Sequence, residues 1–363
     1  MQLTTTADPA LKAMTAMTSR FFRRGLIIAL VSGMLYGLYS AFLTQGMSVG
    51  PWATWYAPDQ TLLTAFVVVY VLGMLGSGVN DLISAVWMVG IAGVKGKFLD
   101  VLRCLKSKPG AVMAVCALIG GPVANGAYII ALQMIGPMAA TITALCPTIG
   151  AIIGRLLFKQ PLNLRMGFGI VICLIAAGLT STGAFTGVTV NTTFLLGVGI
   201  AFIAALGWGI EGAVAGFGTS VMDYEISISI RQTVSGLSTL LVAVPVLALI
   251  GGHLAQAPHL TIAALTSAQA LPWFILSGLC AGLSFGLWYK GNSMSGAALG
   301  MACNGTYAFW VPLFCWIILG LILRQDGWSL SWLNWFSALL MVVGIFLIAV
   351  NPMAWLRRQP REA

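Results

Sequence analysis

Charged residues are scarce in this sequence. Asp, Glu, Lys and Arg make up 7% of its 363 residues, and only nine residues are acidic, whereas soluble globular proteins carry about 25% charged residues. Histidine occurs twice, and there is no HExxH or Walker motif. The seven cysteines form no CxxC pair, so neither a zinc site nor a disulfide framework is expected. The sequence therefore argues against a soluble domain, an ATP-driven pump and an enzyme, and it predicts no cofactor and no metal.

Apolar residues dominate instead, at 59% of the chain with a mean hydropathy of +0.96. A run of about 20 apolar residues crosses a bilayer as an α-helix, and ten such segments can be marked. We therefore expect an all-α membrane protein with ten transmembrane helices. The segments cover residues 25–46, 62–94, 110–133, 136–156, 166–184, 194–218, 230–250, 271–290, 296–323 and 332–350.

Basic residues gather at one end of these segments. They precede the first segment and follow the second, fourth, eighth and tenth segments. Arg231, after the sixth segment, is assigned to the same side. Asp223 and Glu225 lie beside it in the sequence and are expected to form a local ion-pair cluster or helix cap. Between segments on the other side, Arg324 is the only Lys or Arg. This asymmetry follows the positive-inside rule. It predicts that both termini are cytoplasmic, and it explains the net charge of +9 without a nucleic acid partner.

The two halves of the chain resemble each other weakly. Tyr36-Gly37 in the first segment matches Trp208-Gly209 in the sixth, and similar matches link segments three and eight, four and nine, and five and ten. Because a five-helix unit crosses the membrane an odd number of times, two tandem copies insert with opposite orientations, as in many secondary transporters. We expect two inverted five-helix repeats at residues 25–184 and 194–352, a linker at 185–193, and cytoplasmic tails at 1–24 and 353–363.

One carboxylate, Glu211, lies near the middle of the sixth segment. A charge at that depth costs at least ~2.5–3.5 kcal/mol on insertion scales, so a fixed polar partner, a proton, water or a cationic ligand must offset it. Trp208 lies three residues earlier on roughly the same helix face. Gly207, Gly209 and Gly212 create a thin backbone surface that another helix or a ligand can approach closely.

Other stretches resemble a known family. GPMAATITALCPTIG at 136–150, LFKQPL at 157–162 and the glycine-rich fifth segment are similar to the EamA-type, five-plus-five members of the drug/metabolite transporter superfamily. The resemblance covers about residues 25–352. Family members often carry Glu after the apolar end of the fourth segment; this chain has Lys159 and Gln160 there, so no role of that Glu is carried over.

Within this superfamily, LGWGIEG at 206–212 and DYEISISIRQ at 223–232 resemble bacterial choline transporters. The resemblance implies secondary, alternating-access uptake of choline or a related quaternary amine across a bacterial inner membrane. A quaternary ammonium group has no N–H donor and is held by aromatic rings and a nearby anion. The candidate substrate-binding residues are Glu211, Trp208, Trp288, Tyr307, Trp310, Tyr36, Tyr39, Asp81, Asn125 and Asn304.

One alternative within transport stays open from the sequence. The protein could export amino acids, nucleosides or drugs, with Glu211 as a proton-coupling site, because burial raises the pKa of a carboxyl group. The sequence also leaves open whether Asn125 and Asn304 line a cavity or form hydrogen bonds between helices. It leaves the oligomeric state open as well, with a homodimer as one option.

Overall fold

The computed structural model describes residues 9–57, 59, 62–135, 138–143, 145–159, 163–180 and 191–349. Within these ranges the regular secondary structure is entirely helical, which confirms the expected all-α class. Most of the expected linker, the tail after residue 352, the first eight residues, and the Gly136-Pro137 and 160–162 parts of the family motifs lie outside the described residues.

In the described part of the first half there are eleven helical elements, two of them π-helical and labelled η. Their bounds are α1 Pro9–Gly46, α2 Pro51–Trp55, η1 Val67–Val71, α3 Leu72–Val94, α4 Phe98–Leu105, α5 Lys108–Leu118, η2 Ile119–Asn125, α6 Gly126–Ile135, α7 Met138–Thr143, α8 Cys146–Phe158 and α9 Leu164–Thr180.

The second half begins with the long helix α10 and ends with α17. Its elements are α10 Thr192–Val221, α11 Tyr224–Ser238, η4 Thr239–Ala243, α12 Val244–Ile250, α13 Gln256–Thr266, α14 Leu271–Ser295, α15 Ala297–Asn304, α16 Tyr307–Cys315, η5 Trp316–Ile322 and α17 Trp332–Ala349.

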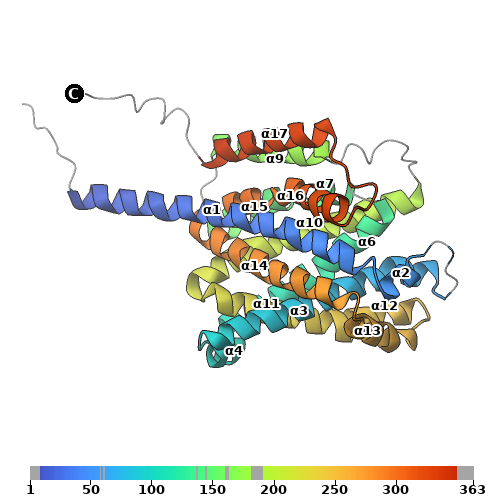
Figure 1. Cartoon of the computed structure of the whole chain (residues 1–363). Helices are drawn as coiled ribbons and strands as arrows, with labels where there is room; N and C mark the ends of the chain where they lie inside the picture. Colours follow the sequence, from blue (N-terminus) through green and yellow to red (C-terminus); the bar gives the residue numbers. More distant parts are fainter. Residues whose placement is uncertain are drawn as a thin grey trace, which may run out of the picture.

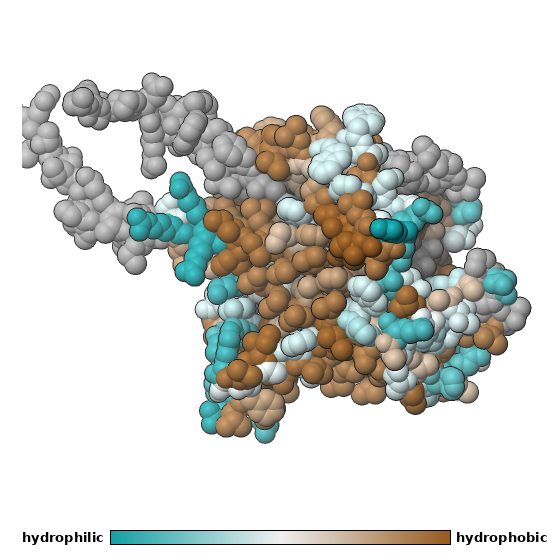
Figure 2. All heavy atoms as spheres, viewed as in Figure 1, coloured by the Kyte–Doolittle hydropathy of each residue, from teal (hydrophilic) through white to brown (hydrophobic). Residues whose placement is uncertain are grey.

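Seven continuous helical stretches in the described part are long and apolar enough to cross a membrane. Hydrophobic side chains cover the middle of the molecule, and hydrophilic ones gather toward the two ends of the helices (Figure 2). Three further apolar helices, at Cys146–Phe158, Leu164–Ala176 and Trp335–Gly344, are shorter. The protein is therefore a multi-pass membrane protein by length and composition, while the count of ten spanning helices stays a prediction. The seven stretches are Ser19–Gly46, Val67–Val94, Lys108–Ala131, Thr192–Val221, Tyr224–Ile250, Leu271–Ser295 and Leu299–Ile322.

Two helices begin earlier than the sequence suggested. α1 begins at Pro9, so part of the expected cytoplasmic tail is helical. α11 begins at Tyr224 instead of residue 230, because Asp223 caps it: its Oδ1 accepts a hydrogen bond from the Glu225 backbone N–H at 2.8 Å. Arg231 consequently lies inside a helix, and its expected place in a cytoplasmic loop is wrong.

The helices pack in pairs that bring the two halves together. In the view of Figure 1, α17 and α9 run side by side along the top of the bundle, and α3 packs against α11 in its lower half. The first long helix, α1, packs along α14 and against α15 and α16. The first long helix of the second half, α10, packs along α5, η2 and α6 and against α8.

Two of the apolar segments are interrupted in mid-course. One break separates α7 from α8, and the other separates α15, which ends at Asn304, from α16, which begins at Tyr307. At the second break the Thr306 hydroxyl donates a hydrogen bond to the Cys303 carbonyl at 2.8 Å.

At both breaks the described backbone tightens into turns with hydrogen bonds between residues three apart, from Leu145 N–H to the Ile142 carbonyl at 3.1 Å and from Phe309 N–H to the Thr306 carbonyl at 2.9 Å. Such a stretch within a helical segment often marks a functional hinge, which makes the space between the two breaks a candidate functional site.

Candidate functional site

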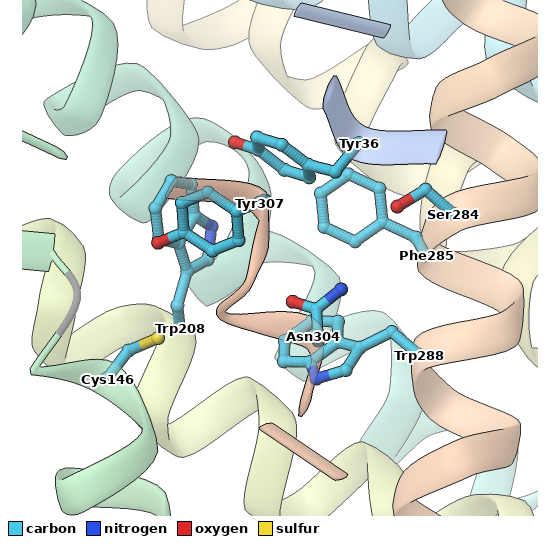
Figure 3. Close-up of a pocket in the computed structure, with 8 residues that line it drawn as sticks. All are labelled: Tyr36, Cys146, Trp208, Ser284, Phe285, Trp288, Asn304 and Tyr307. Atoms are coloured by element: carbon cyan, nitrogen blue, oxygen red, sulfur yellow. The ribbon is translucent and has the colours of Figure 1, made fainter. Parts of the chain in front are cut away.

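A cavity lined by aromatic side chains lies at the two helix breaks (Figure 3). Five of its eight lining residues are aromatic, and α1, α8, α10, α14, α15 and α16 contribute to it. It therefore combines residues from both halves of the chain. The lining residues are Tyr36, Cys146, Trp208, Ser284, Phe285, Trp288, Asn304 and Tyr307.

Helix ends and helix periodicity position these side chains. Cys146 is the first residue of α8, and Asn304 and Tyr307 flank the break between α15 and α16. On α14, Phe285 and Trp288 are three residues apart and share one face. The cavity is thus formed where two interrupted segments meet continuous helices.

The rings form a connected wall. The Tyr36 centroid lies 4.6 Å from that of Tyr307 and 6.1 Å from that of Phe285, and Phe285 lies 5.9 Å from Trp288. These separations fall in the range of favourable aromatic pairs. Trp208 packs on Tyr128 at 5.2 Å. Each of the five lining rings therefore packs on at least one other ring.

The cavity is small in this conformation. Its volume is about 20 Å³, which is room for about one water molecule. An organic cation of several heavy atoms requires the walls to move apart. The structure therefore shows a contracted site.

A buried cluster of three charged residues lies behind this wall. Asp81 of α3, Glu211 of α10 and Arg231 of α11 are each 0% exposed. Arg231 donates from Nε to Glu211 Oε1 at 2.9 Å and from Nη1 to Asp81 Oδ2 at 3.3 Å. Glu211 is therefore not the lone carboxylate that the sequence suggested, because an internal guanidinium neutralises part of its charge.

Further hydrogen bonds hold the guanidinium and both carboxylates in place. Arg231 Nη1 also donates to Gln232 Oε1 at 2.6 Å, and Arg231 Nη2 donates to the Gly120 carbonyl at 3.3 Å. Tyr289 donates its hydroxyl to Glu211 Oε1, and Ser235 donates to Asp81 Oδ2, both at 2.5 Å. All three nitrogens of the guanidinium are engaged, which a buried charge requires.

Gly120 makes this arrangement sterically possible. It lies in the π-helical element η2, and a Cβ built on it would overlap the Glu211 carboxylate. The same closeness occurs at the glycines of α10: a Cβ on Gly207 would clash with Ala124, and one on Gly209 with Ile149. The predicted close approach of other helices to this glycine-rich face is confirmed.

The charged cluster keeps an excess of one negative charge when both carboxylates are ionised, since two anions face one cation. It touches the aromatic wall at Phe285, whose ring centroid lies 4.1 Å from Arg231 Cζ. Trp288 also packs on Tyr289, the Glu211 partner, at 5.5 Å. The charged cluster thus lies directly behind the aromatic cavity.

The structure brings five of the ten predicted site residues together around the cavity: Tyr36, Trp208, Trp288, Asn304 and Tyr307. In the described part of the chain the other five do not line it. Glu211 and Asp81 belong to the charged cluster. Asn125 donates to Ser77 at 2.8 Å between η2 and α3. Tyr39 packs against Tyr36 at 4.9 Å, and Trp310 stacks on Phe314 at 5.9 Å.

Sequence reasoning missed three of the lining residues, Cys146, Ser284 and Phe285, and it also missed Arg231 of the charged cluster. One signal for Arg231 was present: Asp223 followed by Glu225 is a typical helix start, which places Arg231 and Ser235 on one helix face, four residues apart. Both contact Asp81. Phe285 and Cys146 look like ordinary apolar residues in their segments, and no local pattern separates them from core residues.

Ser284 lies in a Gly-Leu-Ser-Phe-Gly sequence, a pattern also found around nucleophilic serines. Here it lies within the helix α14 and not at a strand-to-helix turn. Its hydroxyl donates to the Ser32 backbone carbonyl at 2.7 Å. The hydroxyl is therefore a link between α14 and α1.

A second cluster of charges lies at the start of α11. Lys97 Nζ contacts Asp223 Oδ2 at 2.8 Å and Glu225 Oε2 at 2.7 Å, and Lys95 also pairs with Glu225. Hydrogen bonds to Asp223 and Glu225 raise the pKa of Lys97 above its ordinary value. The expected ion-pair cluster and helix cap are present, with lysines of the α3–α4 connection as partners instead of Arg231.

Within the described residues, no group of three or more His, Cys, Asp or Glu side chains could hold a metal ion.

Comparison with known proteins gives a likeness of fold. No protein-family model and no curated protein matches the sequence. One solved crystal structure, described only as that of a protein, is 14% identical with a TM-score of 0.63, covering 92% of this chain and 99% of that chain. At this identity the likeness concerns the fold alone.

Proposed function

We propose that this protein is a secondary transporter that carries a small organic cation by alternating access between two five-helix halves. The observation that carries the proposal is the aromatic cavity at two helix breaks, one from each half. Interrupted helices in corresponding positions of two halves mark the substrate site in many transporters. Choline or a related quaternary amine is the cargo that fits this wall best, because aromatic faces attract a quaternary ammonium group, which has no N–H to donate.

The packing of the helices supports the two-repeat arrangement. If α1 corresponds to α10, α3 to α11, the helix α5–η2–α6 to α14, and α8 to the pair α15 and α16, then several of the contacts between helices have a counterpart. The contact of α1 with α14 corresponds to that of α10 with α6, and the contact of α1 with α16 to that of α10 with α8. The contact between α3 and α11 joins two corresponding helices and is its own counterpart. The same holds for the contact between α9 and α17, if these two helices also correspond.

The charged cluster supports a positively charged cargo. Its excess negative charge lies behind Phe285 and Trp288, within an apolar bundle where a charge is weakly screened. A cytoplasm-negative potential adds about 2.3 kcal/mol per 100 mV to the entry of one positive charge. We place the protein in a bacterial inner membrane with cytoplasmic termini, a proposal that the asymmetry of Lys and Arg supports even without Arg231.

A flux measurement tests the proposal. Purified protein in liposomes is loaded with unlabelled choline, and the entry of labelled choline is followed with and without a membrane potential. We expect counterflow that tetramethylammonium inhibits and that Glu211→Gln weakens, since the substitution removes the excess negative charge but keeps an oxygen for Arg231 and Tyr289. The matched control is Glu225→Gln, in the exposed cluster, which should keep its flux. Absence of counterflow in folded wild-type protein would contradict the proposal.

The second candidate function, proton-coupled export, has one observation in its favour. Among the described residues Glu211 Oε2 has no hydrogen-bond partner, which is a position where a proton can bind. The same liposomes, loaded with a pH-sensitive dye, separate the two candidates. Export predicts proton movement on addition of an amino acid or drug and no response to choline.

A further inference from the structure

Two indole nitrogens at the cavity carry hydrogen-bond donors without acceptors. Trp208 and Trp288 are each 4% exposed. In the part of the chain that the structure describes, neither Nε1 has a hydrogen-bond partner. An indole N–H can only donate, and buried donors in native proteins nearly always have an acceptor. Whatever occupies the cavity is therefore expected to supply that acceptor.

Other polar groups show that this fold can satisfy such donors. Asn304 Nδ2 donates to Ser32 Oγ, and Ser284 donates to the Ser32 carbonyl, both at 2.7 Å. Outside the cavity, the indole of Trp87 donates to the Ile275 carbonyl at 3.0 Å, whereas the buried indole of Trp52 has no partner among the described residues. The two cavity indoles differ from these groups in facing a space that can receive a ligand (Figure 3).

We propose, on the basis of the proposed transport function, that the cavity selects organic cations that also carry an oxygen acceptor, and that Trp208 and Trp288 donate to that oxygen. The substrate class is then a quaternary amino alcohol or a similar oxygen-bearing cation. A tetraalkylammonium ion has the charge but no acceptor, so it leaves both N–H groups unpaired in a closed cavity.

The ring face and the N–H group of an indole can bind the ammonium group and the oxygen of such a substrate, respectively. The ring face attracts the ammonium group, and the ring edge donates to the oxygen. In the contracted cavity there is room for about one water molecule, which can accept a hydrogen bond from an indole N–H. Substrate binding exchanges that water for the substrate oxygen, which only a ligand with an acceptor can do without loss of affinity.

A pair of ligands of equal charge and similar shape tests the proposal. Choline and propyltrimethylammonium differ in one group, because a methyl replaces the hydroxyl. Each is used to inhibit labelled-choline counterflow in liposomes and to shift the unfolding temperature of the purified protein. We expect wild type to bind choline about ten-fold more tightly than propyltrimethylammonium, as for a site that loses a buried hydrogen bond.

Tryptophan-to-phenylalanine variants then assign the preference to the indoles. Trp208→Phe and Trp288→Phe keep an aromatic face but remove the N–H group. A smaller ring weakens both ligands alike, so the ratio of the two affinities is the readout. We expect each variant to reduce the ratio and the double variant to reduce it to within about three-fold of unity. Trp310→Phe, an indole outside the cavity wall, should leave the ratio unchanged.

The outcomes are distinct. Equal wild-type affinities for the two ligands would overturn the inference and leave cation transport in place. A preference for choline that survives in the double variant would also overturn it, because the discrimination then lies elsewhere. If neither ligand binds to folded wild-type protein, the proposed function fails and the inference falls with it.

Discussion

Two charge clusters lie on α11, one at its first turn and one about two turns further along. In the first, Lys97 and Lys95 bind Asp223 and Glu225, and the lysine side chains are 31% and 50% exposed. In the second, Arg231 binds Glu211 and Asp81, and all three side chains are 0% exposed. The two clusters have the same kinds of charge but different surroundings.

The surroundings decide how much each cluster contributes. Water can replace either partner of an exposed pair, so such pairs contribute at most about 1 kcal/mol. Removing one partner of a buried pair leaves a charge without water and typically costs about 3–5 kcal/mol. The buried cluster also uses an arginine, whose planar fork binds several acceptors at fixed angles, while the exposed cluster uses flexible lysines.

Loss of the buried guanidinium should have the largest effect. Arg231→Met leaves Asp81 and Glu211 without their cation inside the bundle, so we expect the free energy of unfolding to fall by about 3–5 kcal/mol. Denaturant unfolding in detergent micelles measures this change. Arg103→Met, on the exposed helix α4 with its contact to Asp100 at 3.2 Å, is the control and should change little.

The double variant Arg231→Met/Glu211→Gln sharpens this comparison. It removes one of the two carboxylates that Arg231 neutralises, so part of the lost stability should return. Equal stability of Arg231→Met and Arg103→Met would show that the buried cluster is no different from an exposed pair.

A methyl group at Gly120 should have the next largest effect. A Cβ there would overlap the Glu211 carboxylate, and overpacking of this kind costs about 1–3 kcal/mol. Gly90→Ala in α3, where a Cβ would meet nothing within 4 Å, is the matched control and should be neutral or slightly stabilising because Ala favours helices. Thermal unfolding of both variants checks the difference. Equal melting temperatures would mean that the space around Glu211 is not tightly filled.

Removal of one hydroxyl from each cluster compares them with the same substitution. Tyr289 donates to the buried Glu211, whereas Tyr224 donates to Glu225 at 3.1 Å in the exposed cluster. We expect Tyr289→Phe to cost about 1–3 kcal/mol, because a buried carboxylate loses a donor, and Tyr224→Phe to cost less than that. Unfolding midpoints of the two variants decide this, and a larger loss for Tyr224→Phe would reverse the assigned order.

Loss of an exposed lysine should have the smallest effect. Lys97→Met is expected to change stability by less than about 1 kcal/mol, and the change should shrink further in 1 M salt, which screens exposed charges. The raised pKa of Lys97 means that its contribution is fully present below the ordinary lysine pKa of about 10.4 and is lost only as the pH rises above it. Melting curves between pH 6 and pH 9 should therefore show no effect of Lys97 titration. A salt-independent loss would contradict the assignment.

Several features of the fold and the site could be predicted from residue order alone. Long apolar runs predict helices because a backbone in hydrocarbon must satisfy its own hydrogen bonds. Glycines beside Trp208 predicted close helix approach, and Ala124 and Ile149 lie against them. Tyr36 and Trp208, matched through the internal similarity, line one cavity from α1 and α10.

Other parts of the site could not be predicted. Depth along a helix does not tell which neighbour a side chain faces. Trp310 and Tyr39 were therefore grouped with the cavity residues, although Trp310 stacks on Phe314 and Tyr39 packs against Tyr36 without lining the cavity. Arg231 was assigned to the cytoplasmic side together with the other basic residues, because Lys and Arg follow the positive-inside rule. Its two carboxylate partners lie 20 and 150 residues away, beyond any local pattern.

The order of residues by itself determined that this chain forms apolar helices and that aromatic and polar groups lie deep within them, because those properties depend on composition and periodicity. Only the tertiary structure decided that Glu211 shares Arg231 with Asp81, and that Phe285 separates these charges from an aromatic cavity. Pairing of buried charges depends on how helices rotate and cross, and that is set by the packing of the whole bundle.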